Sequence, residues 1–515
     1  MNSPATQPGE AQPPDRAAIW WVPLLLLVFQ LVTVAQYGYF RDELYYLASA
    51  DHLDFGYVEH PPFVVLVAWL VRRVLGDSLI AVRLLPILAG VATTALSALI
   101  AREMGGCRWA QRLAAIATAM APMYIGLSAI LSMNAFDLVF WAACWWAVAR
   151  VIRTGDERWW LAFGLAAGIG LQNKASVLFV GFGVVLGLVL TRRMVSFARP
   201  WLWAGGAIAG IIFLPHVLWQ FAHGWPTLEF IANATRLKNV SYPPWAFMRE
   251  QLLQSGPVTA LLWVTGLIFL LTTRAGRPWR LFAWAYLAIT AVMLSTNAKP
   301  YYLAPAYTVL FAAGGLAAER WTSGRASWAV RVTIAVLMIA GGAVAAPFAK
   351  GVLPIETFVE YADALGMTPG TDEHQQLGRL PQFYADMHGW RELAGHVAEV
   401  YHALPPADQP KACIFGQDYG QAGAIDVFGP ALGLPHAISG HNSYFLWGPR
   451  GCTGEVLIVI DDDRETLERL FQSVEQGGIH TCTDCMPYEN NLPIMVARRL
   501  RMPMTALWPR VKKFI

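Results

Sequence analysis

Charged residues are scarce in this chain. Of its 515 residues only 14% are charged, 56% are hydrophobic, and the mean hydropathy is +0.41. So little charge excludes an ordinary soluble protein of this size, since such proteins carry about 25% charged residues. The composition therefore predicts an integral membrane protein. The net charge is only +3, and we expect no nucleic-acid partner.

Cysteine is also rare, with six residues in the chain. Cys107 and Cys144 lie in or beside apolar runs and are most simply packing residues. The other four lie in the C-terminal third: Cys413, Cys452, Cys482 and Cys485. The spacing of the last two, CxxC, is typical of a redox or metal knuckle, but no second CxxC completes a zinc site. Structural disulfides in an oxidising compartment, or free thiols, are therefore favoured over a catalytic role.

A signal peptide of the cleavable form is missing, because the first apolar run is too long and starts too late. We interpret that run as an uncleaved signal anchor. Residues 1–16, rich in Pro, Ala and Gln, predict a disordered cytoplasmic tail.

Long apolar runs fill most of the first 350 residues. A helix needs about 17–25 such residues to cross a bilayer. Runs of this kind lie near residues 18–37, 79–101, 113–128, 135–149, 159–173, 175–191, 201–222, 257–273, 281–296, 301–318 and 328–347. They predict a bundle of about 11 transmembrane helices.

Arginine clusters in alternate loops predict the orientation, because cytoplasmic loops carry the excess of Lys and Arg. These clusters are Arg102, Arg108 and Arg112; Arg150, Arg153 and Arg158; Arg192, Arg193 and Arg199; Arg274, Arg277 and Arg280; and Arg320, Arg325 and Arg331. The N-terminus is then inside, and residues 38–78 and everything after residue 348 lie outside. Within that first outer loop, 44–53 predicts a short interfacial helix. Pro62–Leu75 is too short to span and predicts an interfacial or re-entrant segment.

The composition after residue 348 is that of a soluble domain. Lys411–Gly416 and Val456–Asp461 predict buried strands, while Arg391–His402 and Arg464–Gln476 predict helices. The fold class we expect is an all-α polytopic membrane bundle over residues 17–348, with a small α/β periplasmic domain over 349–515.

Three charges follow directly after the first apolar run, in Arg41, Asp42 and Glu43. A charge left in hydrocarbon costs about 2.5–3.5 kcal/mol, so this cluster indicates a site that faces an aqueous cavity. An interfacial anchor, with Arg41 and the neighbouring tyrosines at headgroup level, is the alternative.

Several motifs together resemble one family. They are Asp42-Glu43-Leu44-Tyr45-Tyr46, Glu59-His60-Pro61-Pro62, Gly168-Ile-Gly-Leu-Gln-Asn-Lys174, Pro215-His-Val-Leu-Trp219 with Gly224-Trp-Pro226, and Lys299-Pro-Tyr-Tyr-Leu-Ala-Pro305. In this order they resemble the GT-C glycosyltransferases of the protein mannosyltransferase and aminoarabinose transferase type. The resemblance covers about residues 18–320. It implies a GT-C-like fold, a polyprenyl-phosphate sugar donor bound from the outer leaflet, and inversion at the anomeric carbon.

The resemblance also implies roles for the acidic residues. Asp42 is expected to be the general base for the acceptor hydroxyl; a salt bridge to Arg41 or a helix cap is the alternative. Glu43 would orient Asp42, bind a divalent cation or face water. A second acidic position corresponds to Asn134 or to Asp137, one helical turn deeper, and we favour Asp137. Asp42, Glu43 and Asp137 are the only ligand set we consider for a divalent cation (Mg²⁺, Mn²⁺ or Zn²⁺).

Basic and aromatic residues of the same motifs are expected to hold the substrates. Lys299 and Lys174 would pair with the donor phosphate, with snorkelling to the headgroups as the alternative. His60 replaces the Lys often found before Pro-Pro, and Arg83 is a substitute cation. The residues expected to contact substrate are Tyr45, Tyr46, Asn134, Tyr301 and Tyr302.

We therefore predict an inverting glycosyltransferase of the inner membrane, whose acceptor is lipid A, another envelope glycan, a glycolipid or a protein hydroxyl. A transporter or flippase of lipid-linked sugars is the alternative, although no internal repeat supports it. A noncatalytic scaffold would leave the acidic loop unexplained. In the outer domain, residues 440–448 mix polar and aromatic groups as sugar-binding surfaces do, and Asp461-Asp462-Asp463 is more typical of a helix cap than of a metal site.

Overall fold

The computed structural model describes residues 12–296, 298–322 and 327–515. They form two compact units. The first, here called the helical unit, contains the residues up to Val34, Arg83–Leu218 and Ser241–Val352. The second, here called the α/β unit, contains Ala35–Val82, Trp219–Val240 and Leu353–Ile515. The first outer loop, which we assigned to the membrane domain, thus groups in space with the C-terminal residues.

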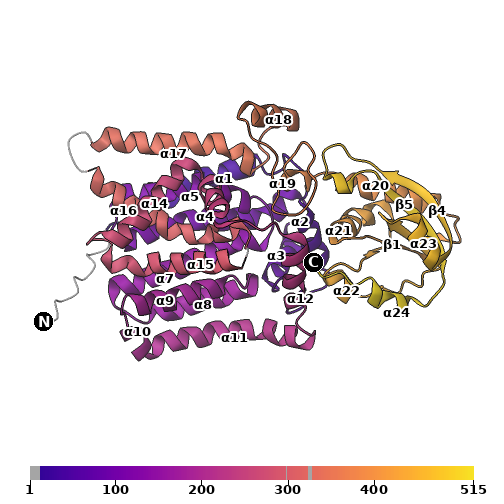
Figure 1. Cartoon of the computed structure of the whole chain (residues 1–515), viewed down its shortest axis with the longest axis horizontal. Helices are drawn as coiled ribbons and strands as arrows, with labels where there is room; N and C mark the ends of the chain where they lie inside the picture. Colours follow the sequence, from indigo (N-terminus) through magenta and orange to yellow (C-terminus); the bar gives the residue numbers. More distant parts are fainter. Residues whose placement is uncertain (1–11, 297, 323–326) are drawn as a thin grey trace. The chain divides into compact units, whose positions relative to one another are not determined.

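The helical unit is built from apolar helices (Figure 1). Two of them, α4 and α11, include a few residues that group with the α/β unit. The bounds of all these helices are η1 Ala17–Trp21, α1 Val22–Val32, α4 Leu79–Glu103, α5 Arg108–Met120, α6 Pro122–Leu127, α7 Met133–Thr154, α8 Trp159–Asn173, α9 Val177–Leu190, α10 Val195–Ala198, α11 Pro200–Ala222, α13 Pro244–Ser255, α14 Pro257–Thr272, η3 Arg277–Trp279, α15 Arg280–Ser295, η4 Pro300–Ala306, α16 Tyr307–Trp321 and α17 Ser327–Ala349. Large aromatic side chains fill its core: Trp141 and Trp145 meet edge to face, and Trp145 meets Phe282 in the same way.

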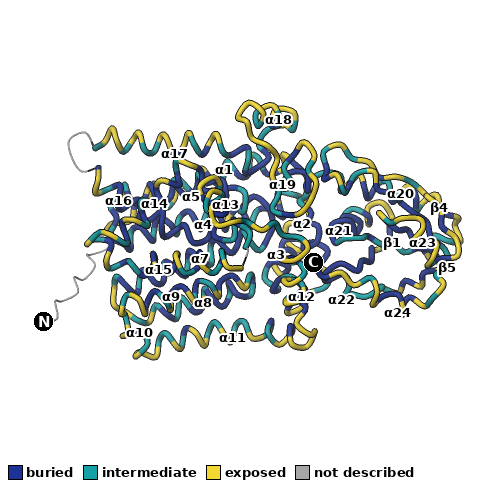
Figure 2. The backbone as a smooth tube through the Cα atoms, viewed as in Figure 1, coloured by how far each residue is buried: buried dark blue, intermediate teal, exposed yellow. Residues whose placement is uncertain are grey.

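Five of the described helices are long and apolar enough to cross a membrane, namely α4, α7, α11, α17 and η4 with α16. The bent pair α13 and α14 would add a sixth. The predicted number of 11 is not confirmed, because several predicted runs form helices of only 14–16 residues. The run at 113–128 breaks at Ala121, which is extended before Pro122. Figure 2 shows long exposed stretches on the apolar helices α11 and α17, as lipid-facing helices require.

The predicted N-terminal tail falls mostly outside the described residues. Its described end, however, packs on α5. Asp15 forms an ion pair with Arg112 at 2.7 Å, and its backbone N–H donates to Gln111 Oε1 at 2.9 Å. At Asp15 the prediction of disorder is therefore wrong, because the ion pair with Arg112 and the hydrogen bond to Gln111 hold this end of the segment.

The α/β unit contains a five-stranded sheet in the order β2-β1-β3-β5-β4. Its strands are β1 Ala412–Phe415, β2 Ala437–Ile438, β3 Val456–Ile460, β4 Phe471–His480 and β5 Leu492–Leu500. β1 runs parallel to β2 and β3, whereas β5 is antiparallel to β3 and β4. The alternation of β3 gives the sheet two apolar faces, with Val456, Ile458 and Ile460 in one core and Leu457 and Val459 in the other.

Helices cover both faces of this sheet. Their bounds, with those of the unit's other helices, are α2 Arg41–Ser49, α3 Phe63–Val74, α12 Pro226–Asn233, η2 Ala234–Lys238, α18 Ile355–Ala364, α19 Gln382–Ala385, α20 Trp390–Ala403, η5 Gln409–Lys411, α21 Tyr419–Phe428, η6 Gly429–Leu432, α22 Ser443–Leu446, α23 Arg464–Leu470, η7 Pro487–Glu489, α24 Met504–Leu507 and η8 Trp508–Arg510. Residues of α2, α20 and α21 share one core with the sheet, and residues of α23 and α24 share the other.

The predicted strands and the helix at 391–402 are confirmed, but the helix at 464–476 is half wrong. It ends at Leu470, and Phe471–His480 forms β4. This segment pairs along most of its length with β5. Pairing with a distant strand overrides local helix preference, which sequence periodicity does not reveal.

Four cysteines form two disulfides, Cys413–Cys452 and Cys482–Cys485. Cys107 and Cys144 are free, and Cys144 is buried in α7. The fold thus supports the prediction of structural disulfides in the C-terminal third.

Candidate functional site

Helix α2 carries the acidic pair and is held at both its start and its inner face. The Glu43 carboxylate accepts a hydrogen bond from the Phe40 N–H at 2.9 Å, which closes the first turn. Leu44, Tyr45 and Ala48 pack in the core of the α/β unit. The predicted interfacial helix therefore exists, but it is buried in protein rather than laid on a surface. Glu43, which is fully buried, acts here as a cap.

Asp42 is the one residue of α2 that is not buried, with 33% of its side chain exposed. The hydroxyl of Tyr419, at the start of α21, donates to Asp42 Oδ1 at 2.8 Å. Arg41 Nε lies 3.8 Å from the same oxygen. One carboxylate oxygen is thus fixed by neighbours, and the side chain still reaches solvent, as a general base for an incoming hydroxyl requires.

Arg41 is the centre of a buried charge network. Its guanidinium lies 3.6 Å from Asp386 and 4.0 Å from Glu373, and Nη1 donates to the Tyr488 hydroxyl at 2.7 Å. Lys238 pairs with Glu373 at 3.5 Å. Burial raises the pKa of Asp386 to about 6, although Arg41 opposes the shift. This network anchors the first turn of α2 to segments more than 300 residues away in sequence.

Glu59 is a site residue that the sequence prediction left without a role. Its carboxylate accepts hydrogen bonds from the Tyr45 hydroxyl at 3.1 Å and from Asn442 Nδ2 at 3.3 Å. Desolvation raises the pKa of Glu59 to about 8, and the negative charge of Asp42 adds to the shift. Glu59 and Asp42 therefore lie close enough for the charge of Asp42 to act on Glu59. The Glu-His-Pro-Pro motif contains the signal, because its first residue is Glu59.

The raised pKa of Glu59 predicts a pH dependence of stability. Between about pH 4.5 and pH 8 the unfolded chain has lost this proton, whereas the folded chain keeps it, so stability falls as the pH rises through that window. Glu59→Gln lacks the titrating group and should not lose this stability. Between pH 5 and pH 8 we therefore expect its free energy of unfolding to increase relative to that of wild type by a few kcal/mol, at roughly 1.4 kcal/mol per pKa unit. Unfolding in detergent at several pH values measures it.

Glu465→Gln is the matched control, because that side chain is 79% exposed. It is expected to follow the wild-type pH profile. Parallel profiles for wild type and Glu59→Gln would contradict a raised pKa at Glu59.

His60, Tyr45 and Tyr46 form an aromatic group around the Glu59 motif. The imidazole of His60 is only 1% exposed; it stacks on Tyr57 at 5.0 Å and meets Tyr46 at 5.1 Å. Its Nδ1 lies 2.9 Å from the Pro61 carbonyl. In this geometry the side chains of the three residues pack against one another. Their predicted contacts with the donor or the substrate stay predictions.

In the helical unit, other predicted residues come together where α7 begins and α8 ends. The Ser176 hydroxyl lies 2.7 Å from both carboxylate oxygens of Asp137. Lys174 Nζ donates to Asn134 Oδ1 at 2.7 Å and lies 4.1 Å from the centre of the Tyr302 ring. A cation held by an amide and an aromatic face is a suitable partner for a phosphate.

The remaining predicted residues lie around the same unit. Tyr301 contacts Tyr302 edge to face, and Lys299 directly precedes η4. Arg83 is 3% exposed and donates to the Val34 carbonyl at 2.8 Å, so its observed role is to join α4 to the end of α1.

The predicted metal ligands fall in different units, Asp42 and Glu43 in one and Asp137 in the other. Among the described residues, no group of three or more His, Cys, Asp or Glu side chains could hold a metal ion. A divalent cation stays a hypothesis for the reaction.

The fold and the site define a class: a multi-pass membrane protein with an acidic helix start in an α/β unit and a lysine with aromatic partners in a helical unit. Comparisons with known proteins show what this chain is similar to. Residues 59–219 match the family model described as dolichyl-phosphate-mannose-protein mannosyltransferase. No curated protein matches the sequence.

Two solved structures of ArnT from Cupriavidus metallidurans share the fold over nearly the whole chain. The apo structure has a TM-score of 0.62 at 17% identity and covers 93% of this chain and 98% of that chain. The structure bound to undecaprenyl phosphate has a TM-score of 0.59 at 16% identity and covers 94% and 98%. The family model matches part of the chain and the ArnT structures share its fold, so both comparisons agree with the resemblance to the protein mannosyltransferases and aminoarabinose transferases seen in the motifs.

Proposed function

We propose that this protein is an inverting glycosyltransferase that moves a sugar from a polyprenyl-phosphate donor to a hydroxyl of the cell envelope. The observation that carries the proposal is Asp42, the single exposed acidic side chain of a buried helix, held by Tyr419 and Arg41. The fold is shared with an ArnT structure bound to undecaprenyl phosphate, which supports a lipid-phosphate donor. The arginine-rich loops support an inner-membrane location with the α/β unit in the periplasm.

Asp42 would remove the proton from the acceptor hydroxyl as that oxygen attacks the anomeric carbon. The bond from this carbon to the phosphate oxygen breaks, and the polyprenyl phosphate leaves with the electron pair. Negative charge therefore develops on the phosphate, where a fixed cation stabilises the transition state. Lys174 and Lys299 are the lysines proposed for this role. Tyr419 and Arg41 would keep the base oriented.

Release of the free lipid phosphate tests the proposal. Purified protein in detergent would receive a panel of polyprenyl-phosphate sugars together with lipid A, glycolipid, glycan or peptide acceptors. Release that depends on an acceptor supports a transferase and identifies both substrates. Lipid movement across proteoliposomes without any release would favour the transporter instead.

Replacing Lys174 by Gln is expected to raise the KM for the donor about 10-fold or more. The change removes the charge that faces the phosphate and keeps a polar side chain next to Asn134 and Tyr302. A hydrogen bond to a charged group contributes about 1.5–3 kcal/mol. Initial rates over a range of donor concentrations measure the effect.

Lys411→Gln is the control, because its ion pair with Glu455 lies on the surface. It should leave KM unchanged. An unchanged KM in Lys174→Gln as well would remove Lys174 from donor binding and leave the phosphate to Lys299.

A further inference from the structure

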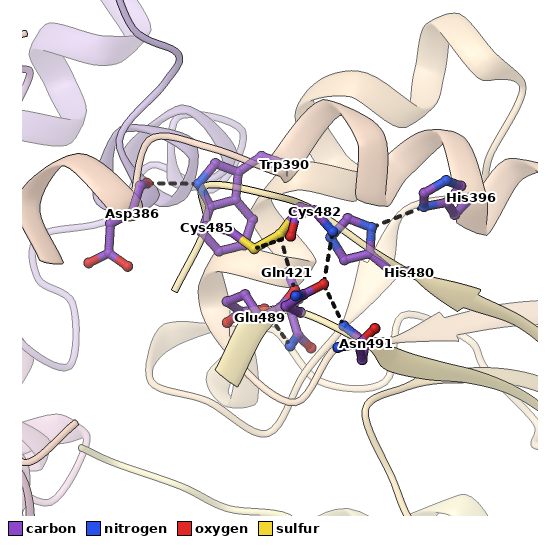
Figure 3. Close-up of a disulfide and its surroundings, with 10 residues drawn as sticks. Asp386, Trp390, His396, Gln421, His480, Cys482, Cys485, Glu489 and Asn491 are labelled. Atoms are coloured by element: carbon purple, nitrogen blue, oxygen red, sulfur yellow. Dashed lines mark hydrogen bonds between the residues drawn. A yellow bond between two sulfur atoms is a disulfide. The ribbon is translucent and has the colours of Figure 1, made fainter. Parts of the chain in front are cut away.

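The connection between β4 and β5 reaches from the edge of the sheet to the network that holds Asp42. It contains the Cys482–Cys485 disulfide and η7. Figure 3 shows the disulfide between Trp390, at the start of α20, and Glu489. We call residues 481–491 the disulfide loop.

The disulfide shapes this loop through local contacts. Cys482 Sγ lies 3.6 Å from the Glu489 carbonyl, and the Cys482 N–H donates to Asn490 Oδ1 at 3.0 Å. Gly389, with φ +88°, packs against the same sulfur, and a Cβ there would lie 3.1 Å from it. The closed ring therefore rests on the N-terminal end of α20 and folds the loop back over itself.

The loop presents two side chains to the neighbours of Asp42. The Tyr488 hydroxyl accepts from Arg41 Nη1 at 2.7 Å and donates to Asp386 Oδ1 at 3.3 Å. Glu489 Oε2 accepts from Gln421 Nε2 at 3.1 Å. Burial and the nearby Asp418 carboxylate raise the pKa of Glu489 well above its usual range.

Both contacts lead to the catalytic carboxylate proposed above. Arg41 precedes Asp42 in α2, and Gln421 lies two residues after Tyr419, whose hydroxyl bonds Asp42. Tyr488 thus contacts Arg41 directly, and Glu489 contacts the first turn of α21, which carries Tyr419.

We propose that the disulfide loop is a positioning device for Asp42, with Tyr488 as its main positioning residue, and that transfer requires the Cys482–Cys485 bond. The inference rests on the proposed function. Reduction by a dithiol breaks the S–S bond, transfers two electrons and two protons to form two thiols, and leaves the reductant as a disulfide. Loosening of the loop then frees Arg41 and Tyr419 to move.

The second disulfide supplies a matched control. Cys413–Cys452 joins residues 39 apart, whereas Cys482–Cys485 joins residues three apart. The stabilisation given by a disulfide grows with the length of the loop that it closes. We therefore expect Cys413–Cys452 to contribute more to the free energy of unfolding, and Cys482–Cys485 to act mainly on the local geometry of its loop.

The experiment compares wild type with Cys482→Ser/Cys485→Ser, Cys413→Ser/Cys452→Ser and Tyr488→Phe. In transfer assays we expect kcat to fall at least 10-fold in Cys482→Ser/Cys485→Ser and about 3- to 10-fold in Tyr488→Phe. The KM for the donor should stay within 2-fold of wild type in both. The control, Cys413→Ser/Cys452→Ser, should lose more thermal stability and keep its kcat within 2-fold of wild type. Loss of kcat in the control alone, or unchanged kcat in both test variants, would overturn the proposal.

Hydrogen exchange provides a readout that does not depend on the activity. Protection of the amides of residues 41–49 should fall in Cys482→Ser/Cys485→Ser and in dithiol-treated wild type, and remain in the control. If no variant, including wild type, shows transfer while this exchange pattern holds, the proposed function fails and the positioning role survives. Unchanged protection in the reduced protein would overturn the positioning role itself.

Discussion

Asp42→Asn is expected to lower kcat for sugar transfer by about 10²–10⁴-fold, the usual contribution of a general base. The amide has the same shape but cannot accept the proton of the attacking hydroxyl. Because the Asp42 side chain is partly exposed and the rest of α2 is buried, the substitution should leave the fold intact. Acceptor-dependent release of polyprenyl phosphate measures the rate, and the melting temperature checks the fold.

Two further variants sharpen this prediction. Asp54→Asn changes an exposed carboxylate of the same outer loop and should keep full activity. Tyr419→Phe removes the hydrogen bond to Asp42 Oδ1 and should lower kcat by roughly 10-fold, the equivalent of about 1.4 kcal/mol. Equal release of polyprenyl phosphate by wild type and Asp42→Asn would remove Asp42 from the mechanism and favour a transporter of lipid-linked sugars.

Arg41→Ala is expected to destabilise the α/β unit by about 3–5 kcal/mol, because it leaves the buried Asp386 carboxylate without its counter-charge. Arg41 is 8% exposed, and its partners Asp386 and Glu373 are 1% and 7% exposed. Chemical unfolding of the purified protein measures the loss. Activity should fall as well, since the first turn of α2 loses its anchor.

The contrast with a surface arginine tests this explanation. Arg379 pairs with Glu356 and Asp484 but is 38% exposed, so Arg379→Ala should cost no more than about 1 kcal/mol. Adding Asp386→Asn to Arg41→Ala should recover part of the loss, because it removes one stranded charge. Equal destabilisation by Arg41→Ala and Arg379→Ala would show that the buried network is unimportant.

The candidate site shows where prediction from sequence ends. Asp42 was chosen because three charges follow an apolar run and match a motif, and the structure leaves that residue exposed. Its partner Tyr419 is 377 residues away, and Glu59 and Asn442 are separated by 383 residues. No local pattern indicates such pairs, because they depend on how the chain folds back on itself.

The sequence by itself determined the membrane class, two strands of the α/β unit, β1 and β3, and the acidic start of α2, and its motifs carried the family resemblance. The class and the two strands depend on composition and on short-range periodicity, which burial imposes residue by residue. Only the tertiary structure decided that the first outer loop packs with the C-terminal residues, that Phe471–His480 is a strand, and that Glu43 caps a helix. It also made Arg41 the centre of a buried network and gave Glu59 its raised pKa. These features arise from desolvation and from contacts between distant segments, and they exist only once the chain is folded.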